Sequence, residues 1–216
     1  IETLMRDPYA VYARHVLGLE ALDPVDADPG AAERGRFIHA VLDRFVREVS
    51  RAPAPMPVDA EARLLDLGRA VTADLRLPPA VIAFWWPRFE RIARWFVGVE
   101  RARRTGLAAS HTEIRGSVVL DAPGGPFRLT AVADRIDRFA DGSFAILDYK
   151  TGSPPSGRDI QRGIAPQLPL EALILDRGGF DGIPAATVSE LAFWRLSGRR
   201  PAGAEIQVLK PGQTAD

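Results

Sequence analysis

Cysteine is absent from the 216 residues of this chain. Disulfide bonds, cysteine-ligated zinc and an iron–sulfur cluster held by cysteines are therefore excluded. Any bound metal must be held by carboxylate, carbonyl or imidazole groups, which suits Mg²⁺ or Mn²⁺. The sequence also has no secretory signal at its start and no apolar run of about 18 residues. These two absences predict a cytoplasmic protein that has no membrane partner.

Net charge is absent too, because the basic and acidic residues balance. Phosphate binding normally needs a basic surface, so this balance argues weakly against a nucleic-acid partner. The basic residues are almost all arginine, and Lys150 and Lys210 are the only lysines. Overall charge does not describe local patches, so nucleic acid stays among the possible ligands.

The composition, with 46% hydrophobic and 26% charged residues, is typical of a globular domain with one sizeable core. We therefore expect a single domain over 1–216, with a mainly helical part at 1–106 and a sheet-containing catalytic core at 107–210. The chain starts at Ile1 rather than at a methionine. We expect it to be a piece of a longer protein.

Helical patterns dominate the first half. The spacing of apolar residues and the end signals predict four helices, over 8–17, 31–50, 59–75 and 78–104. Asp7-Pro8 and Asp28-Pro29 are typical helix starts, and Pro87 should kink or split the fourth helix. Turn-forming residues predict a loop at 23–30 and a break at 52–57.

The second half alternates apolar and polar residues or runs apolar with β-branched side chains. This pattern predicts strands over 112–120, 127–139, 143–149, 187–196 and 204–209. The first three form a meander joined by turns at 121–126 and 140–142, and a loop at 151–163 leads to a helix at 166–176. The order indicates an α/β or α+β domain with an N-terminal helical region.

Asp148 and Lys150 stand two residues apart at the end of an apolar strand. Residues two apart on a strand point to the same face, so a carboxylate and an ammonium group lie side by side. If Asp148 holds a metal, Lys150 can orient or deprotonate a water and offset charge at a scissile phosphate. By itself the pair is more simply explained as an ordinary ion pair at the end of a strand, since such tripeptides occur often by chance.

Asp134 lies 14 residues before Asp148, on the neighbouring antiparallel strand. The two carboxylates face each other only if the hairpin loop has an odd number of residues, and a two-residue turn would put Arg135 opposite Asp148. We therefore predict a three-residue loop with Gly142 at positive φ, or a bulge elsewhere. Opposed carboxylates repel unless a cation lies between them. The alternative is that Asp134 pairs with Arg135 or Arg138, whereas Asp137 has the wrong parity for that face.

Four more polar residues are candidates for the same site. His39 borders the apolar stripe of its helix and is either a metal ligand or a core histidine. Gln167 and Glu171 share one face at the start of a helix, where they either contact the site or are ordinary surface residues. Glu113 is a second-metal or supporting carboxylate, or an exposed strand residue.

Arg88, Arg91 and Arg94 recur at a spacing of three on the predicted fourth helix. This spacing places them along one side, where they could follow the phosphate backbone of DNA. A solvated basic face is the other interpretation.

Taken in order, these residues resemble the RecB-like branch of the PD-(D/E)XK nucleases. The resemblance is closest to the C-terminal nuclease domains of the AddB family, which act in double-strand-break repair, and it covers about residues 2–200. The matching segments are Arg6–Arg14, Leu17–Leu19, Gly35–His39, Glu113, Asp134–Asp137, Asp148–Gly152 and Pro166–Leu168.

The resemblance implies a restriction-endonuclease-like core, a mixed sheet flanked by helices. It implies that His39, Asp134, Asp148 and the backbone carbonyl of Tyr149 ligate Mg²⁺ or Mn²⁺ and that Lys150 is catalytic. Gln167, Glu113, Glu171 and Arg135 would contact substrate or support the ligands. It also implies exonuclease activity on DNA, often on single-stranded ends, within a complex with an AddA-like helicase–nuclease subunit.

The sequence departs from the family pattern at three places. Ala131 stands where a glycine is usual, Glu171 stands where a tyrosine is usual, and the four cysteines of many relatives are missing. The metal and lysine positions are intact. The alternative function is a catalytically silent module of the same fold that binds DNA or docks the AddA-like partner.

Overall fold

The N-terminal part of the chain is helical. In a computed structural model that describes residues 2–19, 30–50 and 55–209, the helices before the sheet are α1 (Glu2–Arg6), α2 (Pro8–His15), α3 (Ala31–Ser50), α4 (Ala60–Asp74) and α5 (Pro79–Arg103). A turn of 3-10 helix, η1 (Arg104–Gly106), leads into the first strand. Within the described residues, no helix is long and apolar enough to cross a membrane.

These helices agree with the sequence prediction in kind and nearly in length. The Asp7 carboxylate caps α2 by accepting a hydrogen bond of 3.1 Å from the backbone N–H of Ala10. Helix α1 was not expected, and α5 runs continuously through Pro87 rather than splitting there. The predicted loop at 23–30, the start at Asp28-Pro29 and the break at 52–57 lie wholly or partly outside the described residues.

A five-stranded mixed sheet forms the centre of the molecule, in the order β1-β2-β3-β4-β5. The strands are β1 (Leu107–Leu120), β2 (Phe127–Phe139), β3 (Phe144–Lys150), β4 (Val188–Leu196) and β5 (Gly203–Leu209). All neighbours are antiparallel except β3 and β4, which are parallel. The predicted meander and the mixed α/β architecture are confirmed, although β1 begins at Leu107 rather than at Thr112.

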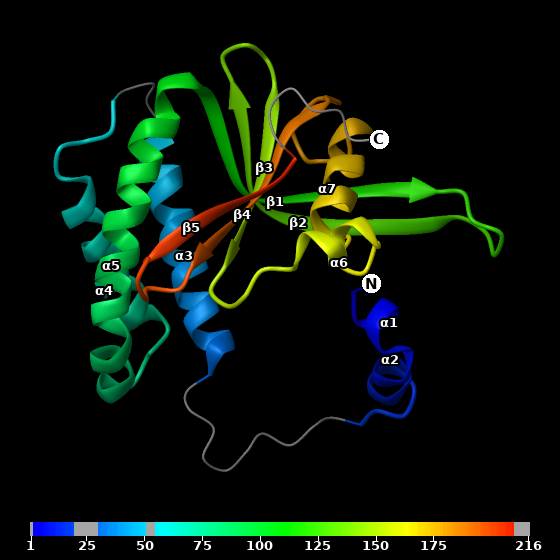
Figure 1. Cartoon of the computed structure of the whole chain (residues 1–216), viewed down its shortest axis with the longest axis horizontal. Coiled ribbons are helices and arrows are strands. Elements are labelled where there is room, and N and C mark those ends of the chain that lie inside the picture. Colours follow the sequence, from blue (N-terminus) through cyan, green and yellow to red (C-terminus); the bar gives the residue numbers. More distant parts are fainter. Residues whose placement is uncertain (1, 20–29, 51–54, 210–216) are drawn as a thin grey trace.

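Helices cover both faces of the sheet, so the molecule has three layers (Figure 1). Alternation along β3 explains why: Leu147 and Tyr149 pack with α3, α4 and α5, whereas Ile146 packs with the helix on the other face. A strand buried on both faces is apolar throughout, as β3 is up to Asp148.

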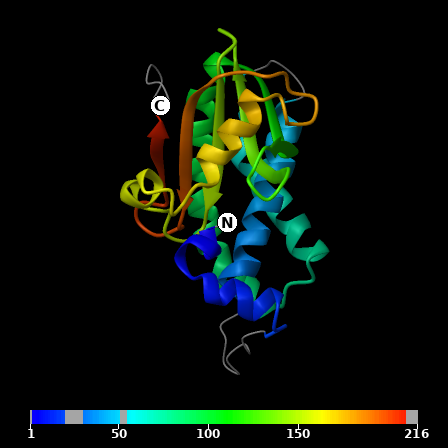
Figure 2. The same cartoon turned by 90° about the vertical axis from the view of Figure 1, so that its right-hand side faces the viewer.

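The parallel step from β3 to β4 needs a crossover, which carries α6 (Gly157–Gln161) and α7 (Gln167–Asp176). Helix α7 lies over the strands (Figure 2) and packs Leu168, Ile174 and Leu175 against them. Helix α6 was missed by the sequence reasoning, which read 151–163 as a loop. The crossover brings Gln167, at the start of α7, to the face of β3 that carries Asp148.

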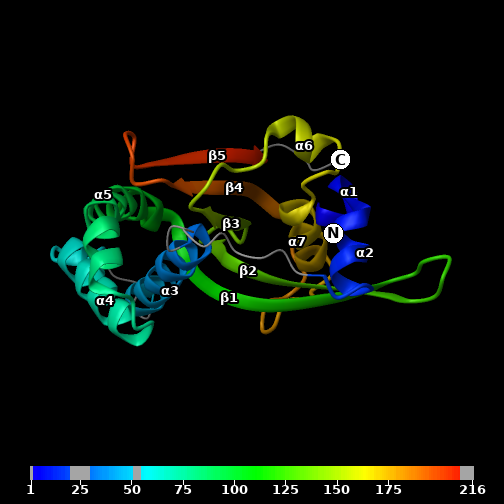
Figure 3. The ribbon, with the colours of Figure 1, turned by 90° about the horizontal axis from the view of Figure 1, so that it is seen from below.

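Strands β1 and β2 continue as a two-stranded ribbon beyond the rest of the sheet (Figure 3). Strand β2 pairs with β1 as far as Phe127, but it pairs with β3 only over Arg135–Arg138. Asp134 therefore lies directly beyond the last residue of β2 that pairs with β3, where the ribbon separates from the rest of the sheet.

Candidate active site

The end of β3 holds a carboxylate, an amine and an amide in contact. Lys150 Nζ lies 3.0 Å and 2.8 Å from the two carboxylate oxygens of Asp148, and it donates a 2.9 Å hydrogen bond to Gln167 Oε1. The amide nitrogen of Gln167 donates in turn to Asp148. The same-face prediction for Asp148 and Lys150 is confirmed, and the structure brings Gln167 to both.

Glu171 lies one helical turn beyond Gln167 and is buried. Its carboxylate accepts a 3.2 Å hydrogen bond from the Gln167 amide. Burial, together with the nearby negative charge of Asp148, raises the pKa of Glu171 to about 8. A carboxyl group that is neutral at pH 7 lets a further acidic residue lie close to Asp148 without adding charge.

Asp134 reaches the same place from β2. The register Arg135–Leu147 and Arg138–Phe144 continues to Asp134 opposite Asp148. The backbone N–H of Phe139 donates a 2.9 Å hydrogen bond to the carbonyl of Ser143, which closes a loop of Ala140, Asp141 and Gly142, and Gly142 has φ of 87°. The predicted three-residue loop with Gly142 at positive φ is therefore confirmed.

The negative charge of Asp134 changes the proton affinity of Asp148. Burial and the negative charge of Asp134 raise the pKa of Asp148 to about 6, against the opposing charge of Lys150. Asp134 does not pair with Arg135 or Arg138; its Oδ2 accepts a 2.8 Å hydrogen bond from the backbone N–H of Tyr149. This arrangement is the one that a bound cation would stabilise.

His39 comes from α3 in the other layer. Its Nε2 donates to the carbonyl oxygen of Tyr149 at 2.8 Å, and its Nδ1 lies 3.3 Å from Asp134 Oδ1. Burial works to lower the pKa of His39, but the hydrogen bond and charge of Asp134 outweigh it and raise that pKa. Asp134 thus favours the protonated form of the His39 ring, and a divalent cation would displace that proton and take over the positive charge next to Asp134.

Glu113 lies nearer to this group than the sequence reasoning anticipated. One ligand atom from each of His39, Glu113 and Asp134 lies within 4.8 Å of the others, and this group of described residues does not include Asp148. Burial and the charge of Asp134 raise the pKa of Glu113, and its φ of 50° is uncommon for a residue with a side chain. These residues line an open cavity of about 570 Å³ with Gly35, Arg36, Ala40, Asp43 and Val132.

The position of Glu113 had a signal in the sequence. The turn at Asp121–Pro126 has an even number of residues, which sets Leu120 opposite Phe127. Counting back along both strands sets Glu113 opposite Asp134. Glu113 therefore lies opposite Asp134 across β1 and β2, just as Asp148 lies opposite Asp134 across β3 and β2.

Arg135 is not at the site, and its assignment as a substrate or supporting residue is wrong. It is fully buried, because neighbouring residues on a strand face opposite ways and Asp134 faces the site. Its guanidinium pairs with Glu100 at 2.6 Å and with Asp137 at 2.7 Å, among the helices of the other layer. The expectation that Asp137 has the wrong parity for the site is confirmed.

The three arginines of α5 do not act as one surface. Arg91 donates a 2.7 Å hydrogen bond to the carbonyl of Gly198, and Arg94 pairs with Glu61 at 3.3 Å. Arg88 lines a separate cavity beside the β4–β5 hairpin. The idea that all three follow a phosphate backbone is therefore wrong for Arg91, which holds the hairpin in place.

The chain is similar to a known protein family over almost its whole length. The family described as the PD-(D/E)XK nuclease superfamily matches residues 1–215. An uncharacterized protein of Rickettsia typhi is 31% identical over 182 residues, which make up 84% of this chain and 21% of that protein. An ATP-dependent helicase/deoxyribonuclease subunit of Streptococcus mutans is 25% identical over 78% of this chain and 15% of that protein.

The chain spans 21% and 15% of the lengths of these two relatives. Among solved structures, SSO0001 shares 14% sequence identity with this chain and superposes on it with a TM-score of 0.36. The superposition covers 85% of this chain and 80% of SSO0001.

Proposed function

The chain belongs to the PD-(D/E)XK nuclease superfamily, and from this premise we propose that it hydrolyses phosphodiester bonds of DNA with the help of a divalent metal ion. Its mixed five-stranded sheet between helical layers is the restriction-endonuclease-like fold that the resemblance implied. The observation that supports activity best is the contact of Lys150 with Asp148 at 2.8 Å, opposite Asp134. A catalytic amine and metal-binding carboxylates are what such a hydrolase needs.

The donor set fits a small divalent cation. Carboxylate oxygens of Asp134 and Asp148, the carbonyl oxygen of Tyr149 and Nε2 of His39 would hold it, with Glu113 as a further carboxylate. His39 Nε2 and the Tyr149 oxygen lie 2.8 Å apart, so both would reach one ion once Nε2 gives up its proton. The imidazole also suits Mn²⁺. When bound, such an ion lowers the pKa of water and offsets charge on a phosphate.

The side chains of the chain supply the rest. Lys150 would hold a water molecule near the scissile phosphate and offset charge that develops on the phosphate oxygens. Gln167 keeps the amine of Lys150 beside Asp148, since it bonds to both of them. Glu171 supports the amide of Gln167 and adds no charge while it is protonated.

Cleavage of a labelled single-stranded oligonucleotide tests this function. We expect Lys150→Met and Asp148→Ala to reduce the rate by about 10²-fold or more, the usual effect of removing a catalytic or charge-stabilising group. Lys210→Met is the matched control, because it removes the only other lysine of the chain. Cleavage by Lys150→Met at the parent rate, with an unchanged circular dichroism spectrum, would exclude this assignment.

Metal binding can be measured without catalysis. Mn²⁺ at about 100 times its Kd should stabilise the folded protein by about 2.7 kcal/mol, and the melting temperature should rise accordingly. His39→Ala should lose this response, because it removes a nitrogen that lies beside both Asp134 and Tyr149. If Glu113→Gln loses the response and Asp148→Ala keeps it, the ion is held by the His39, Glu113 and Asp134 group instead.

We also propose that this domain acts as an exonuclease within a helicase–nuclease complex in double-strand-break repair, with an AddA-like partner. Support comes from the streptococcal relatives named as ATP-dependent helicase/deoxyribonuclease subunits, of which this chain matches about 15% of the length. An exonuclease needs a free end, so linear single-stranded DNA should be degraded and circular single-stranded DNA should persist. Equal degradation of both would identify an endonuclease.

A further inference from the structure

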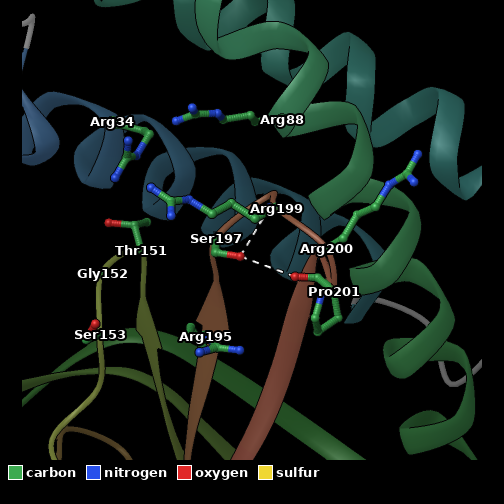
Figure 4. Close-up of a pocket in the computed structure, with 10 residues that line it drawn as sticks. All are labelled: Arg34, Arg88, Thr151, Gly152, Ser153, Arg195, Ser197, Arg199, Arg200 and Pro201. Carbon is green, nitrogen blue, oxygen red and sulfur yellow. Dashed lines mark hydrogen bonds between the residues drawn. The ribbon is translucent and has the colours of Figure 1, made fainter.

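A second cavity, of about 350 Å³, lies beside the end of β3 and is rich in arginine (Figure 4). Its arginines come from α3, α5, β4 and the β4–β5 hairpin, and its other lining residues follow Lys150 along the chain or lie in the hairpin. The lining residues are Arg34, Arg88, Thr151, Gly152, Ser153, Arg195, Ser197, Arg199, Arg200 and Pro201. In Figure 4 the side chain of Arg200 extends away from the other four arginines; Arg34, Arg195 and Arg199 lie nearer to the segment from Thr151 to Ser153, and Arg88 extends from α5 toward Arg34.

The cavity arginines other than Arg200 lack acidic partners in the part of the chain that the structure describes. No carboxylate lies within 4.0 Å of Arg34, Arg88, Arg195 or Arg199 there, and the buried Nε of Arg195 has no hydrogen-bond partner. Arginines elsewhere, such as Arg44 and Arg103, do pair with carboxylates. Four like charges around one cavity repel each other, so the arrangement is stabilised by an anion.

The hairpin that carries Arg199 is held firmly against α5. Arg91 donates to the carbonyl of Gly198 at 2.7 Å. Gly198 has φ of 62°, and a Cβ added there would lie 2.7 Å from both Cβ and the carbonyl oxygen of Arg88. Only glycine permits this approach, which sets the Arg88 and Arg199 backbones at a defined separation.

The cavity lies next to the candidate active site, and its lining residues Thr151 to Ser153 directly follow Lys150. Arg195 is the partner of Lys150 in the parallel pairing of β3 and β4, and adjacent strands lie about 4.8 Å apart. Paired residues on parallel strands point to the same face, so the Arg195 side chain emerges beside that of Lys150. Thr151, Gly152 and Ser153 extend the path directly from Lys150 into the cavity.

We propose that this cavity binds the phosphate backbone of the DNA strand next to the scissile phosphate. The proposal rests on the proposed function for the position of that phosphate. A guanidinium group can donate two parallel hydrogen bonds to a phosphate, and the hydroxyl groups of Thr151 and Ser153 add further donors. The described lining residues include no aromatic side chain on which a base could stack. The cavity therefore binds the backbone without reading sequence.

The salt dependence of binding tests the proposal. A fluorescein-labelled 20-nucleotide single strand is titrated with the protein in EDTA, where cleavage is suppressed, at several salt concentrations. The variant Arg34→Ala/Arg199→Ala removes two guanidiniums that belong to different elements. Each lost phosphate contact lowers the slope of log K against log salt by about 0.7 for a single strand. We expect a slope smaller by about 1.4 and binding weaker by about tenfold or more at low salt.

The control variant is Arg128→Ala/Arg138→Ala, which removes two exposed arginines of β2 that do not line the cavity. It should keep the parent slope and affinity. An unchanged slope in Arg34→Ala/Arg199→Ala, or an equal loss in the control, would overturn the proposal. Binding of inorganic phosphate by the parent with unchanged oligonucleotide binding by the variant would also overturn it.

A neutral linkage locates the contact. Methylphosphonate placed one or two nucleotides from the cleaved bond should slow cleavage by the parent and leave Arg34→Ala/Arg199→Ala no further impaired. Equal slowing of both proteins would place the contact elsewhere. If no protein cleaves DNA but the slope still falls in the variant, the proposed function fails while the arginine cavity remains a DNA-binding site.

Discussion

Arg135 is the residue whose replacement should affect stability most. It is fully buried and donates to Glu100 at 2.6 Å and 3.0 Å and to Asp137 at 2.7 Å. Its guanidinium also lies 5.7 Å from the ring centre of Trp194. Methionine has a similar length and no charge, so Arg135→Met removes the positive charge while leaving only a small cavity.

The expected cost follows from what the partners lose. Asp137 keeps a 2.7 Å ion pair with Arg103 and a 2.6 Å hydrogen bond from Ser110. Glu100 loses both of the hydrogen bonds that it accepts from Arg135 and is 1% exposed. Removing one partner of a buried ion pair costs about 3–5 kcal/mol, a large share of the 5–15 kcal/mol typical of a folded domain.

A double substitution separates charge from packing. Glu100→Met together with Arg135→Met removes both charges, so its cost should be lower than the sum of the two single costs by up to about 3 kcal/mol. Urea unfolding followed by tryptophan fluorescence measures all three, since Trp194 packs in this cluster. Additive single costs, or a cost below about 1 kcal/mol for Arg135→Met, would refute the view that this network is an electrostatic unit.

Three further changes have defined outcomes. Despite its burial, the charges of Arg135 and Arg103 hold the pKa of Asp137 below its usual value of 3.8. The stability that ionised Asp137 contributes is therefore present above pH 3.8 and is lost as the pH falls through the lower pKa of Asp137 in the folded protein. Urea midpoints measured across acid pH should show this loss in the parent and not in Asp137→Asn. Gly142→Ala has open space around its Cβ but φ of 87°, so it should cost only the backbone term of about 1–2 kcal/mol in urea unfolding. Gly198→Ala should raise the Kd for single-stranded DNA, because its Cβ forces the hairpin away from Arg88 without removing a charge.

Periodicity and parity were enough to predict much of the sheet and half of the site. The strand ranges at 127–139 and 143–149 and the three-residue loop at Gly142 follow from alternation and turn chemistry, which act over a few residues. Opposition of Asp134 and Asp148 then follows by counting. Alternation also explains why Arg135 turns away from the site, although the resemblance to a family motif drew attention to it.

What could not be predicted depends on contacts between distant segments. Nothing near Arg195 or Arg199 in the sequence indicates that they meet Arg34 and Arg88, since that requires the parallel β3–β4 pairing and the docking of the hairpin on α5. Arg91 was misread for the same reason, because its partner is the carbonyl of Gly198. The net charge of zero hid a local concentration of arginines, because it sums the charges of the whole chain.

The candidate site combines residues from one short stretch of chain with residues from the more distant β2 and α3. Asp148, Lys150 and Gln167 lie within 20 residues of one another, so this half can form from one stretch of chain. His39 is separated from Tyr149 by 110 residues and is delivered by a helix of another layer. Closing such a long stretch of chain costs more conformational entropy than closing a short one, so we expect this contact to form after those around Lys150. We therefore expect a newly made chain to have Lys150 in place before it has the complete set of proposed metal ligands.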